Sequence, residues 1–278
     1  MNQIFHGLRQ NSLTRVLLVG DGQLAKVLWN QLKAKQVAKQ WSRKTNHKTN
    51  QTFSEVVAEF NPTHVWIAIS DGSIEKFATE NSEFLKGRTV VHFAGSRPSF
   101  SVQASGETTM VASAHPLTTF ASSIEPENFA SIPFVLDLDS PPLSDLLPGF
   151  SNPSVRLNSK DRGYYHALCV MAGNFTVMLW EAMGARFDQL GERPNSGSAE
   201  APSERISHAT LNAFRDQIFE NLASAAAAEN RISVLSGPLS RGDAETIAHH
   251  RSELRARGEI PLLKIYDGFL ELHRTEPK

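Results

Sequence analysis

The strongest chemical signal in the sequence is a glycine-rich turn near its start. Residues 16–25 read VLLVGDGQLA, so the pattern GxGxxA directly follows an apolar run and directly precedes a helical pattern. Gly20 permits a tight turn, and the missing side chain of Gly22 lets a pyrophosphate approach the backbone. Ala25 is small enough for the following helix to lie close to the strand. This arrangement predicts a dinucleotide-binding turn; the alternative is a tight turn that binds nothing.

The helix after the turn contributes to the same prediction. Its first residues, Gln23 and Leu24, offer free N–H groups and the positive end of the helix dipole to phosphates. Asp21 counts against the prediction, because a carboxylate beside a pyrophosphate has to point away from it.

The end of the second strand is expected near Trp41, about 20 residues after the turn, where an NAD site usually has Asp or Glu for the ribose 2′-hydroxyl. The sequence instead has Ser42, Arg43 and Lys44. His47 and Lys48 follow. A hydroxyl plus cations suits a 2′-phosphate, which Arg can bind bidentately. We therefore expect NADP(H) in preference to NAD(H); the alternative is a solvated basic loop.

Polar residues also follow later strands of the predicted sheet. Ser70 and Asp71 come after the third strand and should lie near the cofactor, because the carboxyl ends of strands line the ligand crevice. His92 and His115 stand at the ends of the next two strands. There, each could exchange a proton with a polar substrate, or could be a structural hydrogen-bonding residue.

A second polar cluster opens the helical half of the chain. His166 and Asn174 lie two steps of four residues apart, so they fall roughly on one helical face. Either they satisfy backbone groups inside a helical bundle, or they face the nicotinamide across a domain cleft and hold the substrate.

Two halves can be recognised along the chain. Strands alternating with helices imply a mostly parallel, doubly wound α/β sheet, and the later helices imply a bundle. The Pro- and Ser-rich segment 140–153 lies between them, so we predict a dinucleotide-binding domain over 1–153 and a helical substrate or dimerisation domain over 154–278. The strands are expected at 16–19, 65–69, 89–93, 110–113 and 133–138. The helices are expected at 23–35, 53–60, 74–85, 161–185, 206–230, 243–257 and 261–274.

Composition excludes several classes of protein. Hydrophobic residues make up 40% and charged residues 21% of the 278 residues, which rules out wholesale disorder. The net charge of −1 gives no overall attraction to nucleic acid or an anionic membrane. Cys169 is the single cysteine, so no intrachain disulfide is possible. No signal peptide or apolar run of about 18–20 residues is recognised, so we expect a cytoplasmic protein. His249 and His250 lack further ligands at suitable spacing, and no metal site is expected.

The combination of motifs resembles a known family. The motifs are GxGxxA at 20–25, HFAGS at 92–96, HPLTTF at 115–120, YHA at 165–167 with Asn174, and GPLSRGD at 237–243. They are similar to those of an uncharacterised Rossmann-like oxidoreductase family whose second half is classed as a domain of unknown function. That family looks distantly related to pyrroline carboxylate reductase, ketopantoate reductase and the hydroxyacid dehydrogenases.

The resemblance implies a Rossmann domain followed by an all-α domain like the C-terminal domain of 6-phosphogluconate dehydrogenase, which often dimerises in related reductases. It supplies no substrate. Asp21 and Gln23 depart from the pattern, which usually has a small residue and often Arg there. Related hydroxyacid dehydrogenases use Lys and Asn one helical turn apart; Lys160 and Asn174 are not so spaced, and that role is not transferred.

Together these observations predict an NADP-dependent oxidoreductase that acts on a small polar C=O or C=N substrate. From the resemblance we also expect a homodimer. His115 and His166 are the candidate proton donors, with Asn174 orienting the substrate. The alternative is a non-catalytic NADP(H)- or nucleotide-binding protein whose helical half forms a dimer or partner surface. A deazaflavin-dependent reductase of similar fold is a third possibility.

Overall fold

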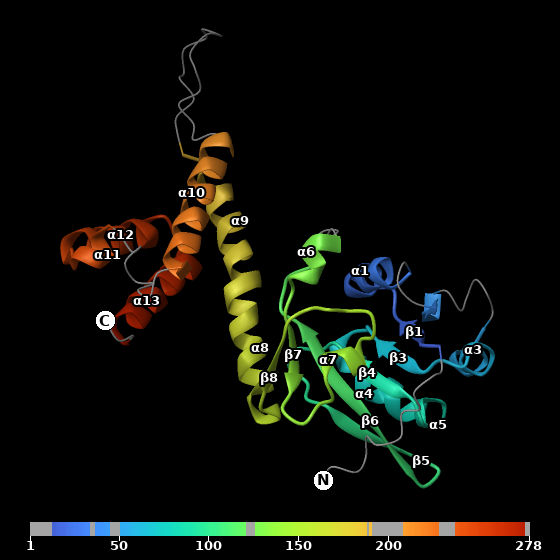
Figure 1. Cartoon of the computed structure of the whole chain (residues 1–278). Helices are drawn as coiled ribbons and strands as arrows, with labels where there is room; N and C mark the ends of the chain where they lie inside the picture. The colour runs from blue at the N-terminus through green and yellow to red at the C-terminus, as the bar shows by residue number, and fades with distance from the viewer. Residues whose placement is uncertain are drawn as a thin grey trace. The chain divides into compact units, whose positions relative to one another are not determined.

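The computed structural model (Figure 1) describes residues 13–33, 37–44, 51–120, 126–187, 189–190, 208–227 and 237–275. The chain divides into two compact units, residues 1–180 and 181–278, which we describe separately. The first unit therefore extends past the boundary predicted at residue 153. Segment 140–153 is packed rather than a free linker, because Leu143, Leu146 and Phe150 are buried in the core of this unit.

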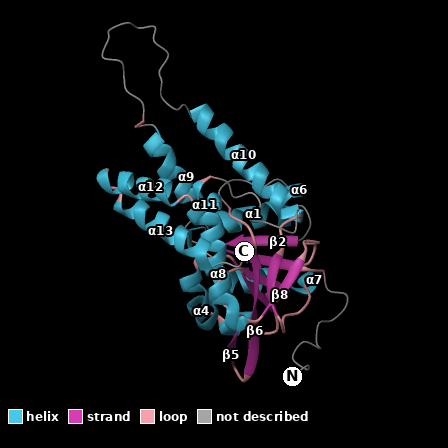
Figure 2. Cartoon of the chain, turned by 90° about the vertical axis from the view of Figure 1, so that its left-hand side faces the viewer, coloured by secondary structure: helices cyan, strands magenta, loops and turns pink. Residues whose placement is uncertain are grey.

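The first unit is built on one sheet of eight strands (Figure 2). The strands are β1 (Arg15–Val19), β2 (Val37–Trp41), β3 (His64–Ile67), β4 (Thr89–His92), β5 (Phe100–Ala104), β6 (Glu107–Pro116), β7 (Phe134–Asp137) and β8 (Ser154–Leu157). Their order is β2-β1-β3-β4-β6-β7-β8, with β5 paired to β6. The first four strands and β6 run parallel, whereas β7 is antiparallel to β6 and β8 parallel to β7. The carboxyl ends of β1, β3, β4 and β6 therefore lie along one edge of the sheet.

The helices that precede β8 cover both faces of the sheet. They are α1 (Gln23–Leu32), α3 (Phe53–Phe60), α4 (Asp71–Glu80), α5 (Ser82–Leu85), α6 (Pro126–Ala130) and α7 (Leu143–Leu146). Alternate residues of β1 enter different cores: Val16 and Leu18 pack with α1 and α7, and Leu17 and Val19 pack with α3 and α4. Burial on both faces explains why the strands are continuously apolar in the sequence. The mostly parallel, doubly wound fold predicted from the sequence is confirmed.

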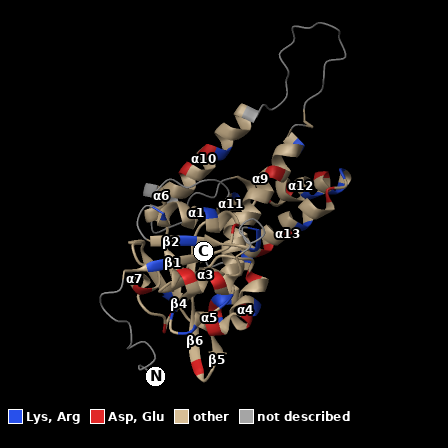
Figure 3. Cartoon of the chain, turned by 90° about the vertical axis from the view of Figure 1, so that its right-hand side faces the viewer, with Lys and Arg blue, Asp and Glu red and all other residues tan. Residues whose placement is uncertain are grey.

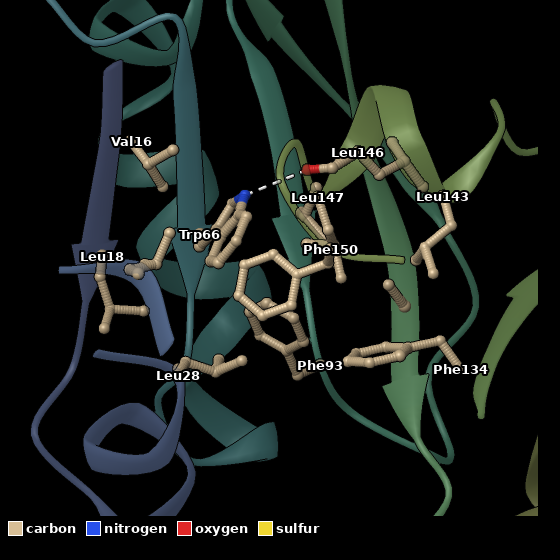
Figure 4. Close-up of a cluster of buried hydrophobic side chains, with 14 of the residues drawn as sticks. Val16, Leu18, Leu28, Trp66, Phe93, Phe134, Leu143, Leu146, Leu147 and Phe150 are labelled. Carbon is tan, nitrogen blue, oxygen red and sulfur yellow. Dashed lines mark hydrogen bonds between the residues drawn. The ribbon is translucent and has the colours of Figure 1, made fainter. Parts of the chain in front are cut away.

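An aromatic cluster fixes α7 against the sheet. Trp66 of β3 packs edge-on against Phe93 and Phe150, with ring centroids 6.0 and 5.3 Å apart. Its indole N–H donates to the backbone oxygen of Leu146 at 3.1 Å, so the buried polar group is paired (Figure 4).

A long helical segment follows β8. A 3₁₀ turn (Ser159–Asp161) leads into α8 (Arg162–Val170), a π-helical turn (Met171–Phe175) and α9 (Thr176–Phe187). By length and composition alone, the stretch Ser159–Phe187 is long and apolar enough to cross a membrane, with a mean hydropathy of 1.3 over an 18-residue window. It is the one such helix in the described ranges, and the sequence-based expectation of no such stretch was wrong in this respect. Its first residue in α8, Arg162, is nevertheless buried against β7 in an ion pair, so this end of the helix belongs to the sheet unit.

The second unit is helical where it is described, as predicted. Besides the end of α9 it contains α10 (His208–Ala227), α11 (Pro238–Arg241), α12 (Ala244–Ala256) and α13 (Ile260–Thr275). Asp243 caps α12 by accepting the Thr246 N–H at 3.0 Å, and an ion pair joins Arg251 to Asp267 of α13. Acidic and basic residues are interspersed on α12 and on α4 (Figure 3), as the near-zero net charge suggests.

Candidate functional site

A pocket of about 790 Å³ lies at the carboxyl ends of β1, β2 and β3. It is lined by the glycine turn, the end of β2 and the start of α4. The candidate cofactor-binding residues on its wall are Gly20, Gly22, Gln23, Leu24, Ser42, Arg43, Ser70 and Asp71. Three segments far apart in the sequence thus form one concave surface, at the place where doubly wound folds bind ligands.

Gly20 makes the turn possible. Its φ of +125° is a conformation that side-chain-bearing residues rarely adopt, and a Cβ there would overlap the carbonyl oxygen of Ala68. Its N–H donates to the Trp41 oxygen, and its own carbonyl accepts from Nε2 of Gln40, both at 2.8 Å. These bonds attach the turn to the end of β2, which lies at Trp41 as the sequence predicts.

Gly22 leaves the space above the turn open. A Cβ at this position would meet nothing within 4 Å, although the backbone (φ −69°, ψ −178°) suits any residue. The first backbone bond of α1 runs from Lys26 to the Gly22 oxygen, so the N–H groups of Gln23 and Leu24 precede the helical ladder. Ala25, in the first turn of α1, is fully buried and does not line the pocket. The open space, free helix N-terminus and small buried residue fit a pyrophosphate.

Asp21 turns its carboxylate toward the end of β2. The Ser42 hydroxyl donates to its Oδ2 at 3.2 Å, and Nζ of Lys44 lies 3.7 Å away. Arg43 and Lys44 are exposed on the pocket wall, whereas Ser42 is buried. His47 and Lys48 lie outside the described residues.

Ser70 and Asp71 form the opposite wall. Asp71 begins α4 and is exposed, and the Ser70 hydroxyl donates to Oγ of Ser73 at 3.0 Å. Both lie at the carboxyl end of β3, as expected.

His92 is a structural residue rather than part of an open crevice. It is completely buried; its Nδ1 accepts the Ala94 N–H at 3.2 Å, so Nε2 donates to the Pro98 oxygen at 3.1 Å. Burial lowers the pKa of His92 to about 4, which keeps the ring neutral. Both nitrogens are used, and the structural alternative therefore holds for this histidine.

His115, Tyr165 and His166 form a compact cluster at the end of β6. Nδ1 of His115 is hydrogen-bonded to the Tyr165 hydroxyl at 2.8 Å. The rings of His115 and His166 stand almost perpendicular, with centroids 5.6 Å apart. The structure thus brings together the two histidines that the sequence nominated.

Gly95, which follows β4, lies directly behind both imidazoles. A Cβ there would overlap the ring of His166 and come within 2.9 Å of Nε2 of His115. The absence of a side chain at residue 95 is therefore what lets both rings approach this strand end.

A buried ion pair lies beneath the cluster. Nε of Arg162 donates to Oδ1 of Asp137 at 2.6 Å, and both side chains are buried. The other carboxylate oxygen, Oδ2, accepts the Ser99 N–H at 2.5 Å. Asp137 therefore links the first turn of α8 to the loop after β4. Nη2 of Arg162 donates to the Val135 oxygen at 3.1 Å, and the third nitrogen, Nη1, is buried without a hydrogen-bond partner.

Burial sets the protonation state of the cluster. It lowers the pKa of His115 to about 4, helped by electrostatic interactions with His166 and Arg162. It also raises the pKa of Tyr165, as does the hydrogen bond with Cys169. At neutral pH His115 is a neutral imidazole and Tyr165 a neutral phenol, so the pair can relay a proton but His115 does not store one.

Asn174 is not part of this cluster. It is exposed in the π-helical turn, and among the described residues no hydrogen bond joins its side chain to His115 or His166. The side chain of Thr119 meets the helix at Gly173 instead, where a Cβ would come within 2.9 Å of it.

Roles for Tyr165, Gly95 and the Asp137–Arg162 pair were not predicted from the sequence. Tyr165 and Gly95 stand inside the YHA and HFAGS motifs, so the motif was a usable signal for both. The ion pair joins residues that are 25 positions apart on different elements, so no local sequence pattern predicts it.

Comparison with known proteins supports the fold. Residues 139–269, which include Tyr165 and His166, match the domain of unknown function DUF2520. No curated protein matches the chain. Among solved structures, a provisionally assigned NADP oxidoreductase from Bacteroides fragilis is similar, with 17% identity, a TM-score of 0.63, and 95% and 98% of the two chains covered.

Two further structures extend this similarity. Protein TM1727 from Thermotoga maritima has 20% identity and a TM-score of 0.57, with 93% of this chain and 96% of that chain covered. Pyrroline carboxylate reductase from Plasmodium falciparum, solved with NADP bound, has 10% identity and a TM-score of 0.51, with 94% and 97% covered. At these identities the likeness concerns the fold. The comparisons confirm the resemblance to an uncharacterised Rossmann-like family: residues 139–269 match DUF2520, and the solved structures share the fold.

Proposed function

We propose that this chain is an oxidoreductase that binds NADP(H) in preference to NAD(H). The observation that carries the proposal is the open space above Gly22, at the free N-terminus of α1 and inside the pocket. A pyrophosphate there would accept hydrogen bonds from backbone N–H groups and interact with the positive end of the helix dipole. Arg43 and Lys44, on the same pocket wall, suit the 2′-phosphate of NADP(H).

The distance between the two candidate areas supports a dinucleotide. Strands β3 and β4 separate β1 from β6, and neighbouring strands lie about 4.8 Å apart, so His115 is roughly 14 Å from the glycine turn along the sheet edge. An extended ligand lying in the pocket and crossing the ends of β3 and β4 would therefore present its far end to Gly95 and the histidine cluster.

The cluster would then serve the acid–base part of the reaction. The bound nicotinamide supplies or accepts a hydride, and the chain's residues have to bind the substrate and move a proton. His115, being neutral, would donate a hydrogen bond from Nε2 when Tyr165 donates to its Nδ1. His166, half-buried beside it, is the second proton-transfer candidate. The substrate class proposed is a small polar molecule with a C=O or C=N bond.

A non-catalytic dinucleotide-binding protein is the second candidate. It is favoured by the exposed position of Asn174, because the histidine cluster then lacks the amide side chain that was predicted to orient a substrate. Such a protein would bind NADPH in the same pocket, but it would not oxidise NADPH when candidate imines or ketones are added.

We also propose a homodimer. α8, the π-helical turn and α9 carry large exposed apolar side chains spaced by four and three residues, which we call the apolar stripe: Tyr164, Leu168, Met171, Phe175 and Met178. This spacing is typical of the seam between packed helices, and one stripe on two copies can pair about a two-fold axis. A second copy is therefore the proposed cover of this helix.

The cofactor proposal is tested at Gly22. Replacing it with Asp places a good N-cap residue at the helix start, so stability should be kept or rise by a few tenths of a kcal/mol. The new carboxylate would occupy the pyrophosphate position, and NADPH affinity should fall at least about 100-fold. Gly22→Asn caps the helix equally well but carries no charge. Comparing the two variants separates the electrostatic from the steric contribution to the loss of NADPH affinity. NADPH and NADH are titrated separately by fluorescence; unchanged NADPH binding to Gly22→Asp overturns the proposed site.

A further inference from the structure

We infer that Asp21 determines how strongly the site prefers NADP(H) over NAD(H). This inference rests on the proposed function. The carboxylate of Asp21 accepts a hydrogen bond from Ser42 and lies near Lys44. With Arg43, these two residues are the groups expected to bind a 2′-phosphate.

The position of Asp21 places a negative charge where the phosphate would bind. The Ser42 side chain is buried, and its hydroxyl points to Asp21 Oδ2 at 3.2 Å. A 2′-phosphate that took a hydrogen bond from Ser42 would therefore lie within a few ångströms of the carboxylate. Like charges at that separation repel, and the pocket wall, being partly shielded from water, screens the repulsion incompletely.

The same carboxylate suits the ribose of NAD(H). Sites that bind NAD(H) usually place an acidic residue at the end of the second strand, where it accepts hydrogen bonds from the ribose hydroxyls. That position is Ser42 here, followed by two cations. Asp21 reaches the same place from the glycine turn and so supplies the acceptor that β2 lacks.

The pocket thus contains groups for both cofactors. Arg43 and Lys44 favour the 2′-phosphate, and Asp21 opposes it while accepting from an unphosphorylated ribose. Lys44 is also paired with Asp21, which reduces the positive charge that it can offer to a phosphate. Both dinucleotides should therefore bind to the wild-type chain, with a limited preference for NADPH.

The test is Asp21→Asn, which keeps the size of the side chain and an oxygen for Ser42. Dissociation constants for NADPH and NADH are measured on the full-length chain, with melting temperature as a check on folding. We expect NADPH to bind about tenfold tighter, because the repulsion is removed and Lys44 is released. NADH should bind severalfold more weakly, because the carboxylate acceptor is lost.

Glu59→Gln is the matched control. It makes the same change in net charge and also breaks a pair with a lysine next to this region, since Glu59 lies 3.1 Å from Lys39 of β2. Glu59 does not line the pocket, so the ratio of NADPH to NADH affinity should not change.

The outcomes separate the inference from the proposed function. If the wild-type chain binds neither dinucleotide, the proposed function is overturned and the inference with it. If the wild-type chain binds one or both and Asp21→Asn leaves the ratio of affinities unchanged, the inference alone is overturned.

Discussion

The hydroxyl of Tyr165 lies 2.8 Å from Nδ1 of His115, so a helix is attached to the end of a strand that is 50 residues away in the sequence. Burial keeps the phenol protonated and the imidazole neutral. When the phenol donates to Nδ1, the ring proton stays on Nε2, the nitrogen that faces Gly95. Tyr165 is therefore a positioning residue for His115.

Replacing Tyr165 with Phe should remove this control. We expect stability to fall by about 1 kcal/mol, the usual net value of a hydrogen bond. The His115 ring should also exchange between its two neutral tautomers, which NMR of the imidazole nitrogens would detect. Tyr266→Phe is the control, because it also removes a tyrosine hydroxyl bound to a histidine, but that histidine is His250. A single Nε2–H tautomer in Tyr165→Phe would contradict the assigned role.

Gly95→Ala should disturb both histidines at once. The added methyl would overlap the His166 ring and crowd His115 Nε2, so we expect a loss of about 1–3 kcal/mol and a displaced pair of rings. Gly163→Ala in α8 meets nothing within 4 Å and should instead stabilise the helix by about 0.5–1 kcal/mol. Urea unfolding of both variants measures the difference. If Gly95→Ala and Gly163→Ala were equally stable, the backbone at residue 95 would have to shift at little cost in free energy.

Acid should destabilise the protein before its carboxylates protonate. The pKa of both His92 and His115 is about 4 in the folded chain, against about 6.5 when unfolded. Between these values the unfolded chain binds protons that the folded chain does not, so stability falls as the pH drops from 6.5 toward 4. Each histidine contributes a slope of up to about 1.4 kcal/mol per pH unit.

The measurement is urea unfolding at several pH values between 5 and 7. In His115→Gln the slope of the unfolding free energy against pH should be smaller by the contribution of one histidine. A substitution of the exposed His249 should not change this slope. A slope that stays the same in His115→Gln would mean that this ring is already protonated in the folded protein.

The proposed dimer predicts a specific response to charge on the apolar stripe. Leu168→Glu or Met178→Glu should convert the dimer to a monomer, because each would bury an unpaired carboxylate at the contact. Sedimentation or light scattering gives the mass directly. Glu181→Gln, a charge change just beyond the stripe, should leave the mass at that of a dimer. A monomeric wild-type chain would disprove the proposal.

The sequence predicted the elements whose signals are local. The turn at Gly20 and the end of β2 follow from apolar runs and glycine spacing, which need no knowledge of tertiary contacts. β5 was missed, although Ser105 and Gly106 both have positive φ and form a tight hairpin turn that a Ser-Gly pair favours. β8 was missed because three of its four residues are exposed, so it lacks the apolar run of a central strand.

The candidate site was predictable only in part. Residues on the pocket wall were nominated from their places at strand ends, and the structure brings them together. Whether His92 or His115 faces a crevice depends on packing, because both stand at strand ends in the sequence. Only the fold shows that Pro98 and Ala94 satisfy His92, whereas Tyr165 binds one nitrogen of His115.

The buried pair of Arg162 and Asp137 also bears on how the chain can be divided for expression. A recombinant fragment ending at residue 153 would keep the carboxylate and lose its guanidinium, together with β8, which hydrogen-bonds along β7. Truncation there would leave the buried Asp137 carboxylate unpaired and would expose β7 as an edge strand. The first destabilises the fold, and the second favours aggregation. A cut after α8 retains both charges, so the sheet is inseparable from the first turns of the helix that follows it.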